Sequence, residues 1–216
     1  VSLLPVQKGF LDMLLKRALM YLTLIGAGYA LGAYVVAWDA LAKAPSPTTQ
    51  TTSNKVNGTA QIKVLFSPND DVQGEIVRTL NAAKKQVLVQ AYLLTDDKIT
   101  NALIAAHQRK VDVRVLLDAV RTQQASGSDA SALSHAGISV KVENRYENAH
   151  NKVIIIDASL PTAVVLTGSY NFTYAASKKN AENLLFIRNA PDVITRYVNN
   201  WTAHDKEAVL YSPTRQ

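Results

Sequence analysis

The chain has 216 residues and no cysteine, and it is 48% hydrophobic and 19% charged. This composition is that of a globular protein rather than a disordered one, and the lack of cysteine excludes disulfides, thiolate nucleophiles and cysteine-ligated zinc. The formal net charge of +6 favours a polyanionic partner, such as nucleic acid or an anionic lipid surface, although simple solubility explains the charge equally well.

The N-terminal part carries an uncharged run of 21 residues, ALMYLTLIGAGYALGAYVVAW, at 18–38. As a helix rising about 1.5 Å per residue, this run would span a hydrocarbon core of roughly 30 Å. Lys8, Lys16 and Arg17 precede it, so the positive-inside rule places residues 1–17 in the cytoplasm and the chain after Trp38 across the membrane. We therefore expect a membrane anchor, with the remainder outside the cytoplasm, in the periplasm if the protein is bacterial.

Two alternatives to an anchor stay open. The first is a cleaved signal peptide, because ALA at 40–42 and AKA at 42–44 both fit the small-x-small pattern of a cleavage site. Cleavage would release a secreted domain into the periplasm. A buried core helix is the other alternative. Residues 39–60 are rich in Pro, Ser, Thr and Asn and predict a flexible linker. The expected organisation is a short basic segment at 1–17, an anchor or signal segment at 18–38, the linker at 39–60 and a folded domain at 61–216.

From residue 61 onward, apolar patterns with the periods of strands and helices alternate. Strands are predicted at 62–66, 86–92, 111–118 and 138–142, and helices at 72–85, 96–109 and 130–135. Residues 152–157 and 163–167 predict a hairpin, followed by a strand at 182–188 and a helix from Pro191 to His204. This order predicts an α/β fold, an αβα sandwich around a mixed β-sheet.

The stretch AHNKVIIID at 149–157 places a histidine and a lysine at the start of a buried strand. Residues two apart in a strand face the same side, so His150 and Lys152 are expected to share one pocket. Asp157 has odd spacing from His150 and is expected to face away, as a structural hydrogen-bonding residue.

A second polar group follows the hairpin in TGSYNFT, residues 167–173. Gly168 is expected to allow a sharp turn, and Ser169 and Asn171 would share a face. Glu182 begins the next strand. Such a set suits a tetrahedral anion: Lys152 and Asn171 would bind its oxygens and Glu182 would fix the imidazole tautomer, with no metal or cofactor required.

His150-x-Lys152-x4-Asp157 followed by Gly168-Ser169-x-Asn171 resembles the HKD motif of the phospholipase D superfamily, and GSYNFT…KNAEN is similar to its small single-motif bacterial endonucleases. The resemblance covers about residues 62–201. It implies that His150 forms a phosphohistidine, while a second HKD histidine protonates the leaving oxygen and then activates water. Because this chain has one motif, the second histidine would come from another subunit of a homodimer.

One departure concerns the ten residues between Asp157 and Gly168, which are more than the small nucleases lead us to expect. We interpret the extra length as a longer hairpin turn that leaves the pocket intact and could change its rim. Lys178, Lys179 and Arg121 are candidates for contact with the substrate. His107 is expected to be exposed, and none of His107, His135 and His204 has a partner that the sequence identifies.

The function favoured by these residues is that of a metal-independent phosphodiesterase, a non-specific endonuclease acting on DNA or RNA outside the cytoplasm. A phospholipase D or phosphatidyl transferase acting on membrane phospholipid is the first alternative. A non-catalytic, membrane-tethered nucleic-acid-binding protein is the second.

Overall fold

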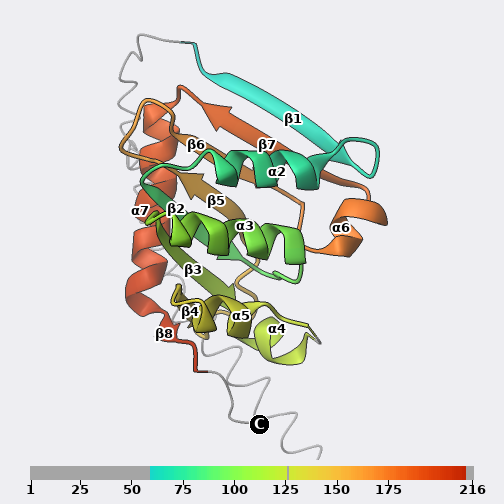
Figure 1. Cartoon of the computed structure of the whole chain (residues 1–216), viewed down its shortest axis with the longest axis vertical. Helices are drawn as coiled ribbons and strands as arrows, with labels where there is room; N and C mark the ends of the chain where they lie inside the picture. Colours follow the sequence, from blue (N-terminus) through green and yellow to red (C-terminus); the bar gives the residue numbers. More distant parts are fainter. Residues whose placement is uncertain (1–58, 126, 213–216) are drawn as a thin grey trace, which may run out of the picture. The chain divides into compact units, whose positions relative to one another are not determined.

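The computed structural model describes residues 59–125 and 127–212, in which eight strands form one mixed sheet in the order β1-β7-β6-β5-β2-β3-β4-β8 (Figure 1). The strands are β1 Gln61–Ser67, β2 Gln86–Ala91, β3 Asp112–Asp118, β4 Ser139–Glu143, β5 Lys152–Ile156, β6 Val164–Gly168, β7 Glu182–Arg188 and β8 Val209–Leu210. The helices are α2 Val72–Asn81, α3 Asp97–Gln108, α4 Ala119–Gln124, α5 Ala130–His135, α6 Tyr174–Lys178 and α7 Pro191–Glu207.

Strand directions bring the predicted site residues to one edge of the sheet. Strand β2 runs parallel to β3 and antiparallel to β5, and Ala91 at its end pairs with Lys152 at the start of β5. Strand β6 runs antiparallel to both of its neighbours, β5 and β7, so the end of β6 and the start of β7 lie at that same edge. We call it the site edge.

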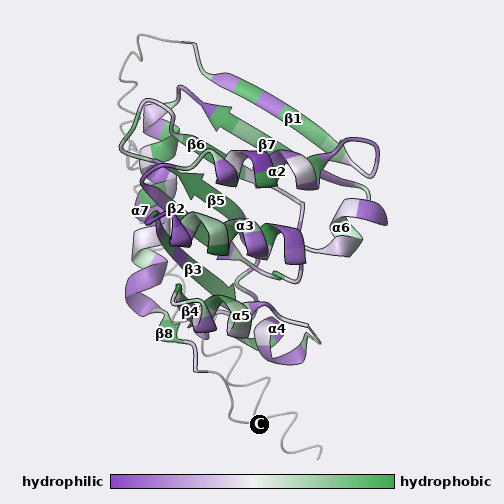
Figure 2. Cartoon of the chain, in the orientation of Figure 1, coloured by the Kyte–Doolittle hydropathy of each residue, from purple (hydrophilic) through white to green (hydrophobic). Residues whose placement is uncertain are grey.

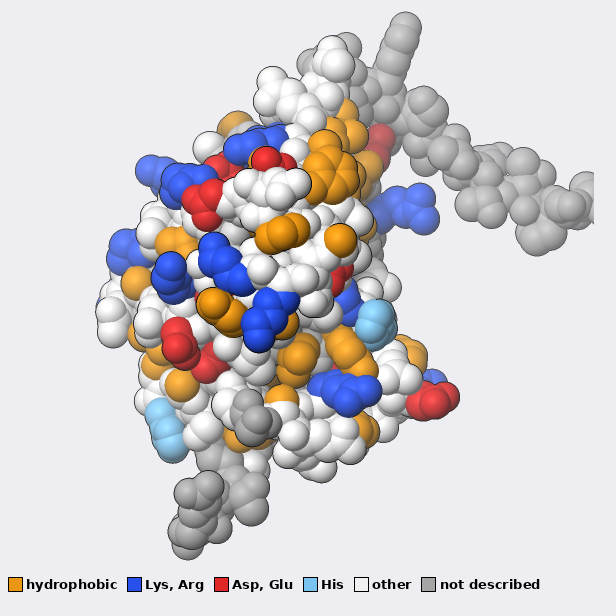
Figure 3. All heavy atoms as spheres, turned by 90° about the vertical axis from the view of Figure 1, so that its right-hand side faces the viewer, with side chains coloured by type: hydrophobic (Ala, Val, Ile, Leu, Met, Phe, Trp, Pro, Cys, Tyr) orange, Lys and Arg blue, Asp and Glu red, His pale blue; other side chains and the backbone are white. Residues whose placement is uncertain are grey.

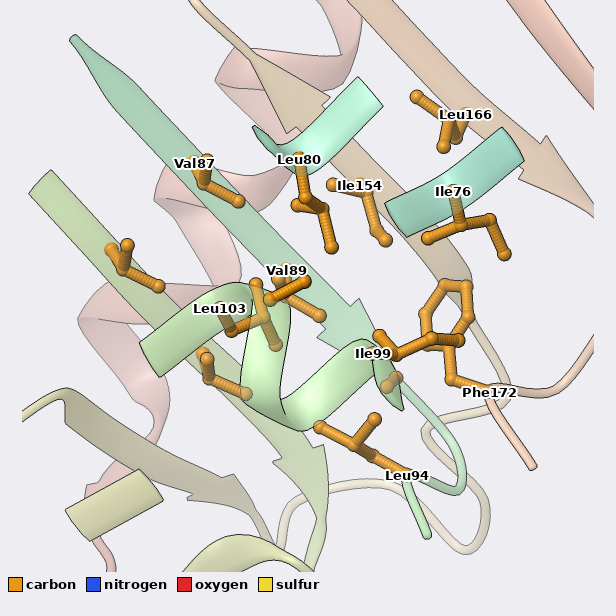
Figure 4. Close-up of a cluster of buried hydrophobic side chains, with 14 of the residues drawn as sticks. Ile76, Leu80, Val87, Val89, Leu94, Ile99, Leu103, Ile154, Leu166 and Phe172 are labelled. Carbon is orange, nitrogen blue, oxygen red and sulfur yellow. The ribbon is translucent and has the colours of Figure 1, made fainter. Parts of the chain in front are cut away.

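Two apolar cores hold the sheet between its helices. Helices α2 and α3 pack on one face, and Figure 4 shows Ile76 and Leu80 from α2 and Ile99 and Leu103 from α3 above Val89 and Ile154. Helix α7 packs on the other face, against β4, β5 and β6. Residues 153–156 of strand β5 are buried on both sides, which is why they form an unbroken apolar run, hydrophobic in Figure 2. Burying each such side chain contributes about 1.5–3 kcal/mol.

The predicted fold class is confirmed, and the predicted strands agree with the structure to within about two residues. The first helix ends at Asn81 rather than 85, because the N–H groups of Lys84, Lys85 and Gln86 bind the Asp157 carboxylate and cannot continue a helix. The last helix runs three residues past His204. The sequence did not predict α4, α6 or β8.

Within residues 59–125 and 127–212, no helix is long and apolar enough to cross a membrane. The anchor predicted at 18–38 lies outside the described residues, as does nearly all of the linker predicted at 39–60.

Candidate active site

His150 lies at the end of a loop that a buried carboxylate fixes in place. Asp118, the last residue of β3, accepts a hydrogen bond from the backbone N–H of Ala149 at 2.8 Å. Its other oxygen accepts from the N–H of Arg121 at 2.7 Å and caps α4. One side chain therefore ties the residue before His150 to the start of α4.

The His150 ring lies against Tyr92, with ring centroids 4.3 Å apart and planes tilted by 57°. Partial burial lowers the pKa of His150, and the positive charges of Lys152 and Arg121 lower it further, while Asp118 opposes them. A lowered pKa favours the neutral form of the imidazole, which has the free lone pair that a nucleophile needs.

Lys152 is buried beside this ring. Its Nζ donates a hydrogen bond to the backbone oxygen of His150 at 2.9 Å and lies 4.7 Å from the centre of the Tyr92 ring. Burial lowers the pKa of Lys152 to about 8, and the nearby charge of Glu182 works in the opposite direction. The ammonium is thus charged at neutral pH but has lost much of its hydration, which strengthens its attraction for an anion.

Tyr92 also contacts Arg121, so three groups gather around one aromatic ring. The Arg121 Nε donates a hydrogen bond to the Tyr92 hydroxyl, and the guanidinium lies 5.4 Å from the ring centre. The hydroxyl in turn donates to Asn148 Oδ1 at 3.3 Å. The sequence analysis missed Tyr92. The one available signal was its position directly after a buried strand, at the same edge as the HKD residues.

Asn171 and Ser169 come from the loop after β6. Asn171 is half-buried, and its Oδ1 is buried with no partner among the described residues. The Ser169 Oγ accepts hydrogen bonds from the backbone N–H of Asn183 at 3.1 Å and from its side chain at 3.3 Å. Because that oxygen already accepts twice, its own hydrogen is left to donate to a ligand.

Gly168 is required by a close approach of two backbones, a reason that the sequence did not indicate. A Cβ on this residue would lie 2.3 Å from the backbone oxygen of Asn183. Any larger residue would push β6 away from β7 and displace Ser169, which follows directly.

Glu182 does not fix the tautomer of His150 within one subunit, contrary to expectation. Its Oε1 accepts a hydrogen bond from Asn180 at 3.0 Å, and the described residues hold no hydrogen bond between Glu182 and His150. Its electrostatic effect falls on Lys152. Contact with Tyr92 is what holds the imidazole instead.

Asp157 lies at the opposite end of β5 from His150, and its contacts are structural. Its carboxylate accepts from the backbone N–H groups of Lys84, Lys85 and Gln86 at 2.7–3.0 Å. The turn that follows, residues 157–163, lies at this far edge of the sheet. The sequence left open whether the extra hairpin length changes the rim of the pocket. Its place at the far edge of the sheet means that it cannot.

Lys178 and Lys179 are exposed at the end of α6, the helix that begins three residues after Asn171. Figure 3 shows several Lys and Arg side chains on the face to which α4 and α6 belong. The expectation that His107 is exposed was wrong, since it is half-buried. His204 has partners that the sequence did not identify: its Nδ1 contacts the buried Glu143, and its ring stacks on Tyr146.

Comparison with known proteins identifies the family. A family model described as "Cardiolipin synthase, PLD-like domain" matches residues 76–205. The chain belongs to the phospholipase D superfamily. It is 39% identical to a phospholipase D of Rickettsia typhi over 140 residues, which are 65% of this chain and 66% of the relative. It is 26% identical to the mitochondrial cardiolipin hydrolase of Xenopus laevis over 151 residues, 68% of this chain and 69% of that one.

Solved structures show the same phospholipase D fold. The phospholipase D family member Nuc from Salmonella typhimurium is 30% identical, with a TM-score of 0.66 over 72% of this chain and 100% of Nuc. NucT from Helicobacter pylori has a TM-score of 0.64 at 19% identity, over 71% of this chain and 100% of NucT. The chain spans about two thirds of the length of the curated relatives. It is thus a phosphodiesterase of the phospholipase D superfamily.

The lowered pKa of Lys152 predicts an alkaline limit to activity. Above a pH of about 8 the ammonium loses its proton, so kcat/KM for a small chromogenic diester such as bis(p-nitrophenyl) phosphate should fall about tenfold for each further pH unit. A pH profile of the native chain beside Lys152→Arg checks this. The arginine variant should be slower throughout but should lack the alkaline fall. A fall at the same pH in both proteins would assign it to another group.

The contacts of Tyr92 predict different defects for two substitutions. Tyr92→Ala removes the surface that holds His150 and Lys152 and should lower kcat about 10–100-fold. Tyr92→Phe keeps the ring and loses only the hydrogen bonds of the hydroxyl with Arg121 and Asn148, so it should mainly raise KM. Steady-state kinetics on the same diester separate the two, and equal loss of kcat in both variants would contradict a role for the ring.

Proposed function

We propose that this chain is a metal-independent nuclease that hydrolyses phosphodiester bonds in DNA or RNA through a phosphohistidine at a site shared by two subunits. The observation that carries the proposal is the exposed His150 at an open sheet edge, next to the exposed Arg121, with the loop of Asn171 at the same edge leading into the helix that ends in Lys178. An exposed nucleophile flanked by solvent-facing cations suits a long polyanion that passes across a surface. The likeness of GSYNFT…KNAEN to the single-motif endonucleases supports the same substrate class.

The proposed chemistry is the mechanism that the resemblance to the phospholipase D superfamily implies, with the roles given to the side chains of this chain. Lys152, Arg121 and the Ser169 hydroxyl bind the non-bridging oxygens of the phosphate. A ring nitrogen of His150 attacks phosphorus, forming a P–N bond as the bond to the leaving oxygen breaks, and the protonated His150 of the partner subunit gives that oxygen its proton. The partner's His150 then takes a proton from water, which attacks phosphorus and breaks the P–N bond. Splitting one displacement into two steps lowers each barrier.

A phospholipase or phosphatidyl transferase is the second candidate, favoured by the names of the relatives, phospholipase D and mitochondrial cardiolipin hydrolase. The uncharged run at 18–38 also supports it, since a membrane anchor would hold the domain near lipid. We propose the anchor, with the domain outside the cytoplasm, for either substrate.

The deciding experiment compares substrates in excess EDTA. Full-length protein is incubated with single- and double-stranded DNA, with RNA, and with vesicles containing phosphatidylcholine or cardiolipin, each beside a His150→Ala control. Cleavage of nucleic acid that depends on His150 would support the nuclease. Release of lipid head groups with nucleic acid left intact would replace it with the lipid enzyme. If the native protein cleaves nucleic acid only when a divalent metal is present, the metal-independent mechanism is wrong.

A further inference from the structure

The loop between β4 and β5, residues 144–149, leads directly to His150 and has little support of its own. We call it the β4–β5 loop. Residues 144–148 are exposed, whereas Glu143 before them and Ala149 at the end of the loop are buried. Outside the sheet ladder, the loop makes no backbone–backbone hydrogen bond with another described residue. Its conformation, and with it the position of His150, therefore depends on side-chain contacts.

The end of the loop next to His150 is held by two contacts of the site. Asp118 accepts a hydrogen bond from the Ala149 N–H at 2.8 Å, and the Tyr92 hydroxyl donates to Asn148 Oδ1 at 3.3 Å. These contacts hold the last two residues of the loop. Residues 144–147 must be held from elsewhere.

A buried carboxylate and one imidazole hold the start of the loop. Glu143, the last residue of β4, is 3% exposed, and Gln90 Nε2 donates to both of its oxygens, each at 3.2 Å. His204 of α7 also binds Glu143, with Nδ1 as the donor because a carboxylate oxygen accepts. The His204 ring stacks on Tyr146, with ring centroids 5.2 Å apart and planes tilted by 27°. One imidazole thus contacts both the end of β4 and the middle of the loop.

Helix α7 gives His204 a fixed base. The buried Trp201 donates its indole N–H to the backbone oxygen of Val89 in β2 at 2.9 Å. Asp205, next to His204, pairs with Lys141 of β4 at 2.8 Å. Strand β8 follows the helix directly and pairs with β4, and Figure 1 shows the end of α7 beside these two strands. The loop is therefore attached to a part of the fold that is itself well anchored.

Stability alone gives a weak reason for this arrangement. The Lys141 pair and the apolar core already hold α7 against β4. Burying the Glu143 carboxylate costs desolvation, which its hydrogen bonds offset only in part. What such a buried group does provide is a single geometry, because its hydrogen bonds are satisfied in one arrangement only.

We propose that His204 is a positioning residue for the phosphodiesterase reaction. Through Glu143 and Tyr146 it holds the β4–β5 loop in the conformation that sets the His150 ring against Tyr92. The inference rests on the proposed function in one respect, that His150 is the nucleophile. It applies equally to a nucleic-acid substrate and to a lipid substrate, because it concerns the nucleophile rather than the group that leaves.

The role is tested first by kinetics of the full chain on bis(p-nitrophenyl) phosphate. His204→Ala should lower kcat about 10–30-fold with little change in KM, because the nucleophile is misplaced while the phosphate contacts remain. His204→Asn places an amide nitrogen near the position of Nδ1, so it should restore the bond to Glu143 and recover several-fold in kcat.

Asp205→Ala is the matched control. It breaks the pair with Lys141 between the same helix and the same strand without touching the loop, so it should cleave at the native rate. Thermal unfolding shows whether each variant is folded. A native kcat in folded His204→Ala, or an equal loss in Asp205→Ala, would overturn the proposal.

A spectroscopic measurement reports the position of His150 without using activity. The chain has four histidines, so their ring signals in an NMR spectrum can be assigned by single substitutions. The Tyr92 ring, 4.3 Å from the His150 ring, shifts the His150 signals by its ring current. Tyr146→Ala removes an exposed ring, so the variant should fold, and it should move the His150 signals while those of His135 stay in place. Unmoved His150 signals would overturn the proposal.

A double-mutant cycle separates positioning from a general loosening of the fold. If Tyr92 and His204 both act by placing His150, the variant that carries Tyr92→Ala and His204→Ala should lose less in kcat than the product of the two single losses. A full product would mean that the two act independently and would contradict the proposal. Native activity in His150→Ala would instead reject the proposed function, and the NMR result would still show what places His150.

Discussion

His150→Ala is expected to lower the rate of phosphodiester cleavage by about 10⁴-fold or more, because it removes the group that forms the covalent bond. Neither its exposed position nor its contact with Tyr92 suggests a large contribution to stability, so the variant should fold normally. The cleavage rate is measured in single turnovers of a labelled oligonucleotide and of bis(p-nitrophenyl) phosphate. A thermal unfolding curve measures the stability of the variant.

His135→Ala is the matched control, since His135 is also exposed but lies on α5 and contacts only Ser131. It should cleave at the native rate. Trapping a phosphorylated native chain by acid quench, with none in His150→Ala, would identify the intermediate. Residual activity of a few per cent in His150→Ala would argue against a nucleophile at this position.

Asp157→Ala is expected to lower the free energy of unfolding by about 3–5 kcal/mol. The buried carboxylate satisfies three backbone N–H groups at once, and its loss would leave all three without a partner. Asp157 also has a positive φ of 51°, which alanine adopts less readily than aspartate or asparagine. Urea denaturation followed by circular dichroism measures the change.

Two further variants sharpen the result. Asp157→Asn retains one acceptor oxygen and should lose roughly half as much stability. Asp97→Ala, at an exposed position in the first turn of α3, should cost less than about 1 kcal/mol. Because Asp157 lies at the far end of β5, folded Asp157→Asn should cleave its substrate at a near-native rate. A stable but inactive Asp157→Asn protein would mean that the motif aspartate takes part in the chemistry.

The sequence predicted the strands well because their patterns are strong: VIII at 153–156 is buried on both faces, and apolar residues at 62, 64 and 66 repeat with the period of a strand. Short α4 and α6 carried no periodic signal. Both begin at a polar cap, Asp118 and Thr173, whose contacts within the fold stabilise them. The predicted end of α2 was too late, because Asp157, more than 70 residues away, accepts hydrogen bonds from the backbone N–H groups that follow the helix.

The HKD residues could be recognised from spacing alone because they lie next to one another along the chain. Tyr92 could not, since it reaches the site only through the pairing of β2 with β5. Arg121 was predicted as a substrate contact from its place after a strand, but not its contact with Tyr92, which depends on the pairing of β2 with β3. The role expected for Glu182 failed for a similar reason. Proximity in sequence to a catalytic motif does not tell which neighbour a carboxylate will face, and here it faces Lys152 and Asn180.

The sheet order has a consequence for how the protein is made. Tyr92, Asp118 and Arg121 come from the β2-β3-β4 half of the sheet, while His150, Lys152 and Asn171 come from the half built by β5, β6 and β7. Strand β1 is made first among those described but pairs only with β7, almost the last. A ribosome must therefore complete β7, and with it nearly the whole domain, before the sheet and the full set of site residues are in place. We therefore expect a chain that ends before β6 and β7 to lack phosphodiesterase activity.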